Sequence, residues 1–263
     1  MPQSLSERLL AVAFIVLGGV LLAANLGLLR SDVERVVQVV WPASLIAAGL
    51  WLVLGRQNQA TAEPPACSIE RGDFTGGDLL ALTGTADMHL GASPESSGLL
   101  TADVPGLDSP RLEAREGVAH VRLQPHLSVA PRRGPGWSVK LAKGLPWRLD
   151  LQSSLGDFEL DLHDLTVAEA RLRSTFGDVD LSLPAAGESL FVIDLIFGDL
   201  NLRLPEGVAA RIKVAAGPLV TVHHDERRFI QLGPNEWATP LYAVAPDRCT
   251  LAVRLSTGDL YVK

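Results

Sequence analysis

The stretches SSLGDFELDL (153–162), STFGDVDLSL (174–183) and LIFGDLNLRL (195–204) repeat one pattern at a constant interval of 21 residues. In each stretch, a Gly-Asp pair follows an apolar residue and precedes apolar residues that alternate with polar ones. Alternation with a period of two is typical of a strand with one buried face. Each unit therefore predicts a strand, a Gly-Asp corner and a second strand. The predicted corner residues are Gly156, Asp157, Gly177, Asp178, Gly198 and Asp199.

A repeat that keeps the same inward residue in every unit favours a β-solenoid, in which equivalent strands stack in register. A meander of hairpins is the competing arrangement, but hairpin strands do not require an inward residue at a fixed interval. One unit buries about six side chains, worth roughly 10 kcal/mol, whereas ordering its residues costs at least ~20 kcal/mol. A unit therefore needs neighbours on both sides, and we expect a single-stranded, right-handed β-helix-like solenoid. The predicted inward ladder contains Leu151, Leu172 and Ile193 before the corners and Leu160, Leu181 and Leu202 after them.

The pattern continues weakly beyond the three clear units. Residues 137–141 (WSVKL) lie 21 positions before the first strand that follows a corner, which predicts a degenerate earlier turn. Toward the C-terminus, Gly217 and Gly258 resemble further corners at irregular spacing, as bulges would produce. We expect residues 66–134 to form an N-terminal β region that caps the solenoid, and residues 135–263 to contain the repeats and a C-terminal cap.

Two apolar stretches without charged residues, 9–29 and 36–54, precede the β-rich part. At 1.5 Å per residue a helix over the first stretch reaches about 31 Å, enough to cross a bilayer. Only RSDVER separates the two, so we expect a transmembrane helical hairpin over 1–55, followed by a polar linker at 56–65. A cleaved signal peptide is the alternative for the first stretch, and the second apolar stretch directly after it disfavours this.

The positive-inside rule gives a small bias toward a cytoplasmic location for both termini and for the β domain. The arginines behind this bias are Arg8, Arg56 and Arg71 on one side of the hairpin, against Arg30 and Arg35 on the other. Cys67 and Cys249 fit either a single disulfide outside the cell or two free thiols in the cytosol, and we favour free thiols.

The residues that could carry chemistry are better explained as structural. A net charge of −7 disfavours binding to nucleic acid, and the common motifs for nucleotide binding, serine hydrolysis and zinc proteolysis are absent from the sequence. His223-His224 could contribute to a metal site, but neighbouring side chains on a strand point to opposite faces. The corner aspartates could form a column that holds a cation, or each could bond to turn backbone. We expect no catalytic residue, no cofactor and no metal site.

Several short pieces of the sequence match a known pattern when taken together. In the apolar region they are NLGLL (25–29), WP (41–42) and GLWL (49–52). In the β-rich region they are Trp137 to Leu141, Pro146 to Leu151, Asp161 to Leu165, and a stretch with Pro205, Gly207, Val208, Arg211 and Ile212. In these pieces the chain resembles bacterial LiaF-type membrane proteins of the cell-envelope stress response. Two features differ: some relatives have four spans rather than two, and their corners often read Gly-Ala-Gly.

The resemblance implies a non-enzymatic, multi-pass protein of the bacterial cytoplasmic membrane with a toast-rack or LiaF-like β domain. It further implies an interaction or sensory role, in which the protein modulates an envelope-stress response through a membrane histidine kinase or another envelope protein. The alternative is a structural scaffold whose solenoids associate with one another as homo-oligomers. The partners expected from sequence are thus the lipid bilayer, a kinase or envelope protein, or a second copy of the chain.

Overall fold

The computed structural model describes residues 67–94, 98–104, 110–124 and 136–263. All of these lie in the second of two compact units, Glu63–Lys263, and all of their regular structure is strand. Within the described ranges no helix is long and apolar enough to cross a membrane. The expected spans at 9–29 and 36–54 lie outside the described residues. The expectation of an all-β solenoid is confirmed for the part of the β domain that the structure describes.

The strands follow one another through short corners and turns. In chain order they are β1 (Cys67–Glu70), β2 (Gly76–Gly84), β3 (Met88–Ala92), β4 (Gly98–Asp103), β5 (Arg111–Arg115), β6 (Val118–Leu123), β7 (Trp137–Leu141), β8 (Pro146–Leu155), β9 (Phe158–Asp161), β10 (Thr166–Phe176), β11 (Val179–Ser182), β12 (Glu188–Phe197), β13 (Leu200–Arg203), β14 (Ala209–His224), β15 (Ile230–Gly233), β16 (Glu236–Ala238) and β17 (Arg248–Val262).

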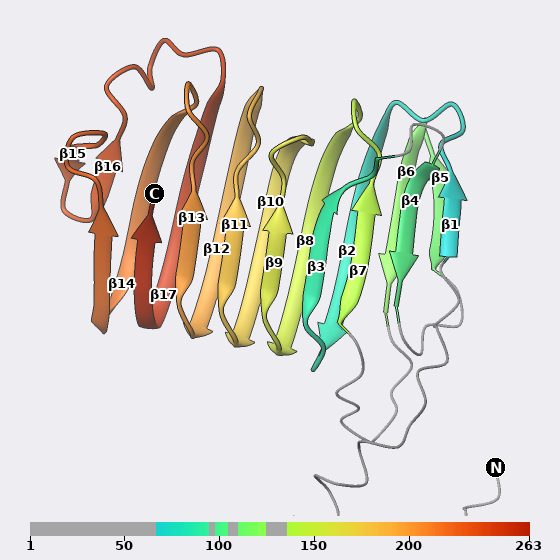
Figure 1. Ribbon diagram of the computed structural model, residues 1–263, viewed down its shortest axis with the longest axis horizontal. Coiled ribbons are helices and arrows are strands. Elements are labelled where there is room, and N and C mark those ends of the chain that lie inside the picture. Colours follow the sequence, from blue (N-terminus) through green and yellow to red (C-terminus); the bar gives the residue numbers. More distant parts are fainter. Residues whose placement is uncertain (1–66, 95–97, 105–109, 125–135) are drawn as a thin grey trace, which may run out of the picture. The chain divides into compact units, whose positions relative to one another are not determined.

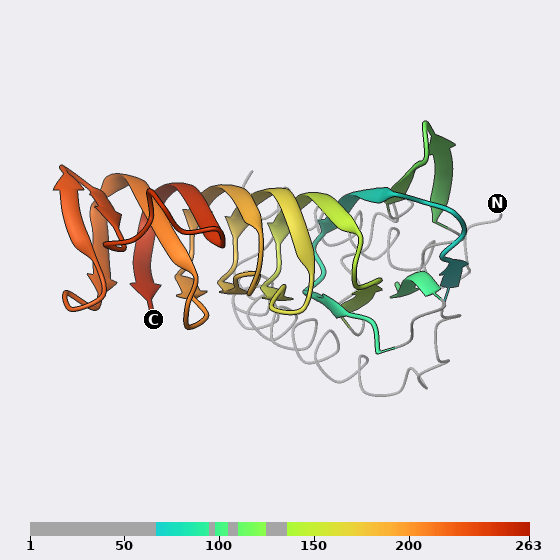
Figure 2. The same cartoon turned by 90° about the horizontal axis from the view of Figure 1, so that it is seen from above.

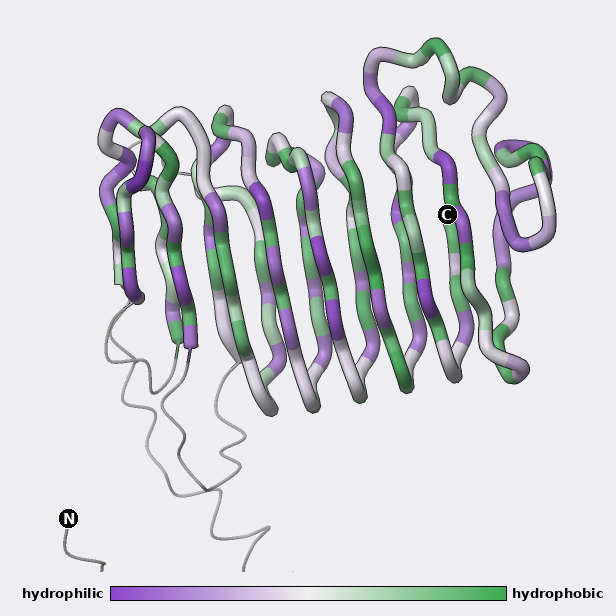
Figure 3. The backbone as a smooth tube through the Cα atoms, turned by 180° about the vertical axis from the view of Figure 1, so that it is seen from behind, coloured by the Kyte–Doolittle hydropathy of each residue, from purple (hydrophilic) through white to green (hydrophobic). Residues whose placement is uncertain are grey.

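The coils stack into two parallel faces that enclose one core (Figures 1 and 2). One face runs β6-β2-β8-β10-β12 and then the first halves of β17 and β14. The other runs β7-β3-β9-β11-β13 and then the second halves of the same two long strands. Figure 3 shows apolar and polar residues alternating along each coil, as a strand with one buried face requires.

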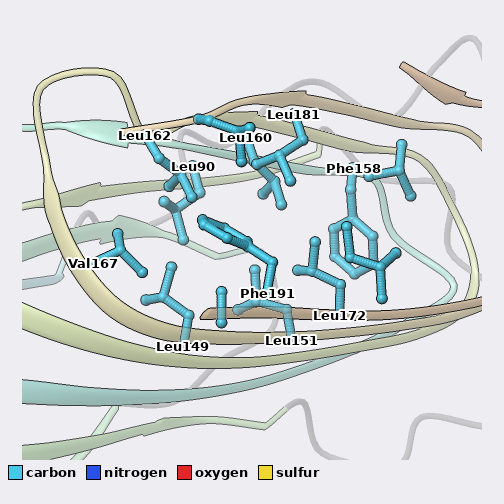
Figure 4. Close-up of a cluster of buried hydrophobic side chains, with 14 of the residues drawn as sticks. Leu90, Leu149, Leu151, Phe158, Leu160, Leu162, Val167, Leu172, Leu181 and Phe191 are labelled. Carbon is cyan, nitrogen blue, oxygen red and sulfur yellow. The ribbon is translucent and has the colours of Figure 1, made fainter. Parts of the chain in front are cut away.

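The inward ladder residues are stacked in register in the core. Leu151 pairs with Leu172 and Leu172 with Ile193 on one face, while Leu160, Leu181 and Leu202 align on the other. None of the six is more than 1% exposed. In Figure 4, Leu149, Leu151, Leu172 and Phe191 point from one face toward Leu160, Leu181 and Leu90 of the other.

The stacking order differs from the sequence order at the N-terminal end. The 21-residue spacing of Trp137–Leu141 predicts that β7 stacks on β9. The structure differs, because β3 lies between these two strands and pairs with both. Residues 76–92, expected only to cap the solenoid, therefore supply a complete coil. Met88 and Leu90 are buried there because they stand opposite Phe158 and Leu160 and continue their rows.

A second insertion occurs at the C-terminal end. Strand β17 is the last in sequence, yet it lies between β12-β13 and β14. Its Gly258-Asp259 pair forms the corner above Gly198-Asp199, and Gly217 lies in the following coil. The pairing of β14 with β17 shifts register between Ala216 and Leu219, the bulge expected from the sequence.

Antiparallel strands cover part of both ends of the stack. At the N-terminal end, β4 pairs with β7, β1 with β4, and β5 with β6. At the C-terminal end, β16 pairs with Arg211–Lys213 of β14 and with β15. Strands of opposite direction interrupt the parallel ladder, which limits the open edges on which further chains could pair.

Candidate functional site

The corner glycines allow the coils to approach closely. Gly156, Gly177 and Gly198 have φ of 140°, 136° and 138°, values that side chains rarely permit. A Cβ on Gly177 would overlap the carbonyl oxygen of Gly156, and one on Gly198 would overlap that of Gly177. Gly258 repeats this arrangement on Gly198 with φ 126°. Only glycine fits where the backbone of one corner rests on the next.

The corner aspartates form a hydrogen-bonded column along this edge. The amide of Asp178 donates to Oδ1 of Asp157, and the amide of Asp199 donates to Oδ1 of Asp178, both over 2.8 Å. The column extends at each end, because Asp157 N–H donates to Asp87 over 3.0 Å and Asp259 N–H donates to Asp199 over 2.8 Å. Each carboxylate thus satisfies the backbone of the neighbouring coil rather than that of its own turn.

The possible metal ligands noted in the sequence are engaged in other contacts. His223 stacks on Tyr261 with ring centroids 4.7 Å apart, and His224 lies against Phe229 and Trp237. Within the described ranges, no group of three or more His, Cys, Asp or Glu side chains has the geometry to hold a metal ion. In Asp157, Asp178 and Asp199, the Oδ1 atom already accepts a hydrogen bond from an amide of the next coil.

An apolar row runs beside the aspartate column, at the position just before each corner glycine. Leu155, Phe176 and Phe197 stand side by side on β8, β10 and β12, and each is about half exposed. The rings of Phe176 and Phe197 are stacked, with centroids 4.9 Å apart and planes 5° apart. Ile196 is exposed next to this row. The sequence shows these apolar residues, but its alternation does not indicate that they face solvent.

Further exposed apolar residues lie at the C-terminal end of the solenoid, on separate segments. Leu219 on β14 and Leu241 and Val244 in the segment before β17 are 74%, 68% and 78% exposed. Ile230 and Leu232 of β15 are also exposed. From Leu219 to His224, strand β14 pairs with β17 on one side, and none of the described strands pairs with its other side.

Both cysteines are free, and they lie at opposite ends of the stack, Cys67 in β1 and Cys249 in β17 (Figure 1). A disulfide between them would require their Cα atoms to approach within about 7 Å. Cys249 is buried opposite Ser189, and this burial raises the pKa of its thiol to about 11.

Two segments of the chain match models of known protein families. Residues 8–53 match the family model of the LiaI-LiaF-like transmembrane region, and residues 114–199 match that of the N-terminal domain of toast_rack, DUF2154. No curated protein matches the chain. The resemblance to LiaF-type proteins noted in the sequence is confirmed by the two family matches.

One solved structure shares the β fold. A proposed cell adhesion protein from Clostridium sporogenes ATCC 15579 is 18% identical over 75% of this chain and 97% of its own, with a TM-score of 0.64. A proposed adhesin from Bacteroides fragilis NCTC 9343 is 11% identical over 75% of this chain and 96% of its own, with a TM-score of 0.30. At this level of identity the first of these shows a common fold and nothing further.

Proposed function

Because this chain joins a LiaI-LiaF-like transmembrane region to a toast-rack β-solenoid, we propose that it is a non-enzymatic interaction protein of the bacterial cytoplasmic membrane that modulates an envelope-stress response through a membrane histidine kinase. The resemblance to LiaF-type proteins supports the class of partner. The exposed apolar row of Leu155, Phe176 and Phe197 is the observation that supports a contact surface.

The apolar row has the physical properties of a protein contact. Its side chains project from strands whose corners are locked together by Gly packing and Asp hydrogen bonds. A partner therefore meets a surface that loses little conformational entropy on binding. Aromatic side chains are enriched at the centres of protein interfaces, and those that become fully buried there contribute most of the binding energy.

Photo-crosslinking in living cells tests this proposal. A photoreactive amino acid replaces Phe176 or Phe197 in the full chain, and a matched control carries it at Arg173, which is exposed on the same strand β10. We expect a histidine kinase to be crosslinked from the apolar row and not from the control position. Crosslinks from both positions alike, or from neither, would contradict the proposal.

We also propose that the solenoid lies on the cytoplasmic side, which the arginine distribution around the hairpin supports. Glu206→Cys in a Cys67→Ser background places one accessible thiol in an exposed turn. A membrane-impermeant maleimide should label it only after spheroplasts are permeabilised. Labelling of intact spheroplasts would place the domain outside.

A structural scaffold is the second candidate function, and the open edge of β14 with its exposed Leu219, at the C-terminal end of the solenoid, favours it. Through such ends the solenoids of two copies would associate. Crosslinking from Leu219 to other copies of this chain, with no kinase crosslinked from the apolar row, would support the scaffold over the kinase contact.

A further inference from the structure

The outward face of β2, β5, β6, β8 and β10 is hollowed into a groove with a cavity volume of about 430 Å³. One wall is the β5–β6 hairpin, which projects from the side of the solenoid (Figure 2). The volume lies in the range of small-molecule sites, roughly 300–1,000 Å³. The groove is distinct from the apolar row, which lies at the corner edge of the coils.

One row of side chains across this groove alternates between acidic and basic residue types. The strand register places Glu113 opposite His120, His120 beside Asp78, Asp78 beside Arg148, and Arg148 beside Glu169. His120 Nδ1 lies 3.0 Å from a carboxylate oxygen of Asp78. Each basic side chain of this row stands between two acidic ones, an arrangement that stabilises neighbouring strands.

The next row of side chains does not alternate in this way. Arg111 on β5 stands directly opposite Arg122 on β6, and the residue beside Arg122 on β2 is Leu80. Like charges directly opposite each other destabilise a pair of strands. Among the described residues, no carboxylate forms an ion pair with Arg111, Arg122 or Arg148, although all three line the groove.

The carboxylates that share the groove are already engaged. Glu113 pairs with Arg115 over 2.6 Å, Glu169 pairs with Arg171 over 2.8 Å, and Asp78 pairs with His120. Asp150 accepts a hydrogen bond from Gln152 over 3.1 Å. The groove therefore holds an excess of positive charge inside a chain whose net charge is −7.

We propose that this groove binds a phosphate monoester or diphosphate group between Arg111 and Arg122, with Arg148 as a third cation. Guanidinium groups present their N–H donors in a planar fork that matches phosphate oxygens in pairs. A group carrying two negative charges neutralises the opposed arginines, so it removes the repulsion between them. This site does not depend on whether the protein contacts a kinase.

Phosphate of this kind comes either from a soluble metabolite or from the headgroup of a membrane lipid. The test therefore uses the full chain in phosphatidylcholine nanodiscs, with inorganic pyrophosphate as the soluble probe. A second set of nanodiscs contains phosphatidic acid, a lipid with a phosphate monoester. The melting temperature, followed by tryptophan fluorescence, reports binding because a ligand that binds only the folded state stabilises it.

We expect pyrophosphate or phosphatidic acid to raise the melting temperature of the wild-type chain. A response to pyrophosphate indicates a soluble phosphate ligand, and a response to phosphatidic acid alone indicates a lipid headgroup. Arg122→Gln should weaken the affinity about tenfold or more, the loss expected for a charge-assisted hydrogen-bonded pair. Without ligand, the same variant should melt at the wild-type temperature or above it, because the repulsion with Arg111 is gone.

Two further variants make the result specific. Arg111→Gln removes the other member of the pair from an exposed edge strand and should reproduce both effects. Arg173→Gln removes an exposed arginine of β10 outside the groove and should bind as the wild type does. Absence of any thermal shift with both probes, or an equal shift in wild type and in both groove variants, would overturn the proposal.

Discussion

Each corner glycine is fixed by two separate constraints, its backbone angle and the carbonyl of the next coil. For Gly177→Ala we expect a loss of roughly 3 kcal/mol or more in the free energy of unfolding, because the added Cβ cannot avoid the Gly156 carbonyl without separating the coils. Urea denaturation of the full chain in detergent micelles measures this loss.

Two other glycines separate these constraints. Gly187 has φ 92° with nothing within 4 Å of an added Cβ, so Gly187→Ala should cost only the backbone strain, about 1 kcal/mol. Gly233 has open space and no unusual φ, so Gly233→Ala should change stability by less than about 0.5 kcal/mol. Equal losses at all three positions would contradict the packing explanation for the corners.

The buried thiol of Cys249 predicts a pH dependence of stability. Burial raises its pKa to about 11 in the folded state, while an unfolded cysteine titrates near ~8.5. Its contribution is therefore fully present below about pH 8.5 and decreases as pH rises toward 11, since only the unfolded chain releases the proton in that window. Melting temperatures between pH 7 and 11 should fall less steeply in Cys249→Ala than in wild type. If the melting temperatures of the two proteins fall in parallel with pH, a group other than Cys249 controls the loss of stability at alkaline pH.

At the scale of the elements, the aspartate column links neighbouring coils through side chain and backbone. Asp178→Ala removes the acceptor for the Asp199 amide and should cost about 1–2 kcal/mol. Asp178→Asn retains an oxygen acceptor and removes a charge from a column of carboxylates spaced by about 4.8 Å, so its cost should be much smaller.

The dependence on salt distinguishes the hydrogen bonds of this column from the repulsion between its carboxylates. Added salt screens repulsion between exposed carboxylates, so the melting temperature of the wild type should rise with ionic strength more than that of Asp178→Asn. Thermal melts from 0.05 to 1 M NaCl measure this difference. An alanine variant as stable as the asparagine variant would show that the hydrogen bond to Asp199 contributes nothing.

Three coils could be predicted from the sequence because their interval is constant, and a constant interval makes Leu151, Leu172 and Ile193 stack by necessity. The insertions of β3 and β17 have no such signal. Their corners, at Asp87 and Asp259, join the column from 70 residues before Asp157 and 60 residues after Asp199. Local alternation indicates which face of a strand is buried, but it does not indicate which coil the strand stacks against.

At the scale of the whole molecule, surface features are harder to predict from the sequence than the core is. The stacked pair Phe176 and Phe197 fits the repeat equally well as buried or exposed, and only the turn of the chain at the corner leaves the rings in solvent. The Arg111–Arg122 pair depends on the β5–β6 hairpin and on its place beside β2. Charges that are distant in sequence meet only once the coil order is known.

The C-terminal end of the solenoid predicts self-association. The edge of β14 from Leu219 to His224 has free backbone groups on its outer side within the described structure, and Leu219 on this edge is exposed. An unprotected edge with apolar side chains favours pairing with another strand. Two identical edges can pair around a two-fold axis, which closes the assembly as a dimer.

We therefore expect the full chain in detergent micelles to sediment as a dimer at high concentration and as a monomer on dilution. Leu219→Glu places a charge on the pairing edge and should shift the equilibrium toward monomer by tenfold or more, about 1.4 kcal/mol. Leu190→Glu is the matched control, because Leu190 is also exposed but lies on β12 in the middle of the stack. A chain that stays monomeric at every concentration would remove the scaffold as a function and leave the kinase contact. A dimer that dissociates equally in both variants would place the interface away from the β14 edge.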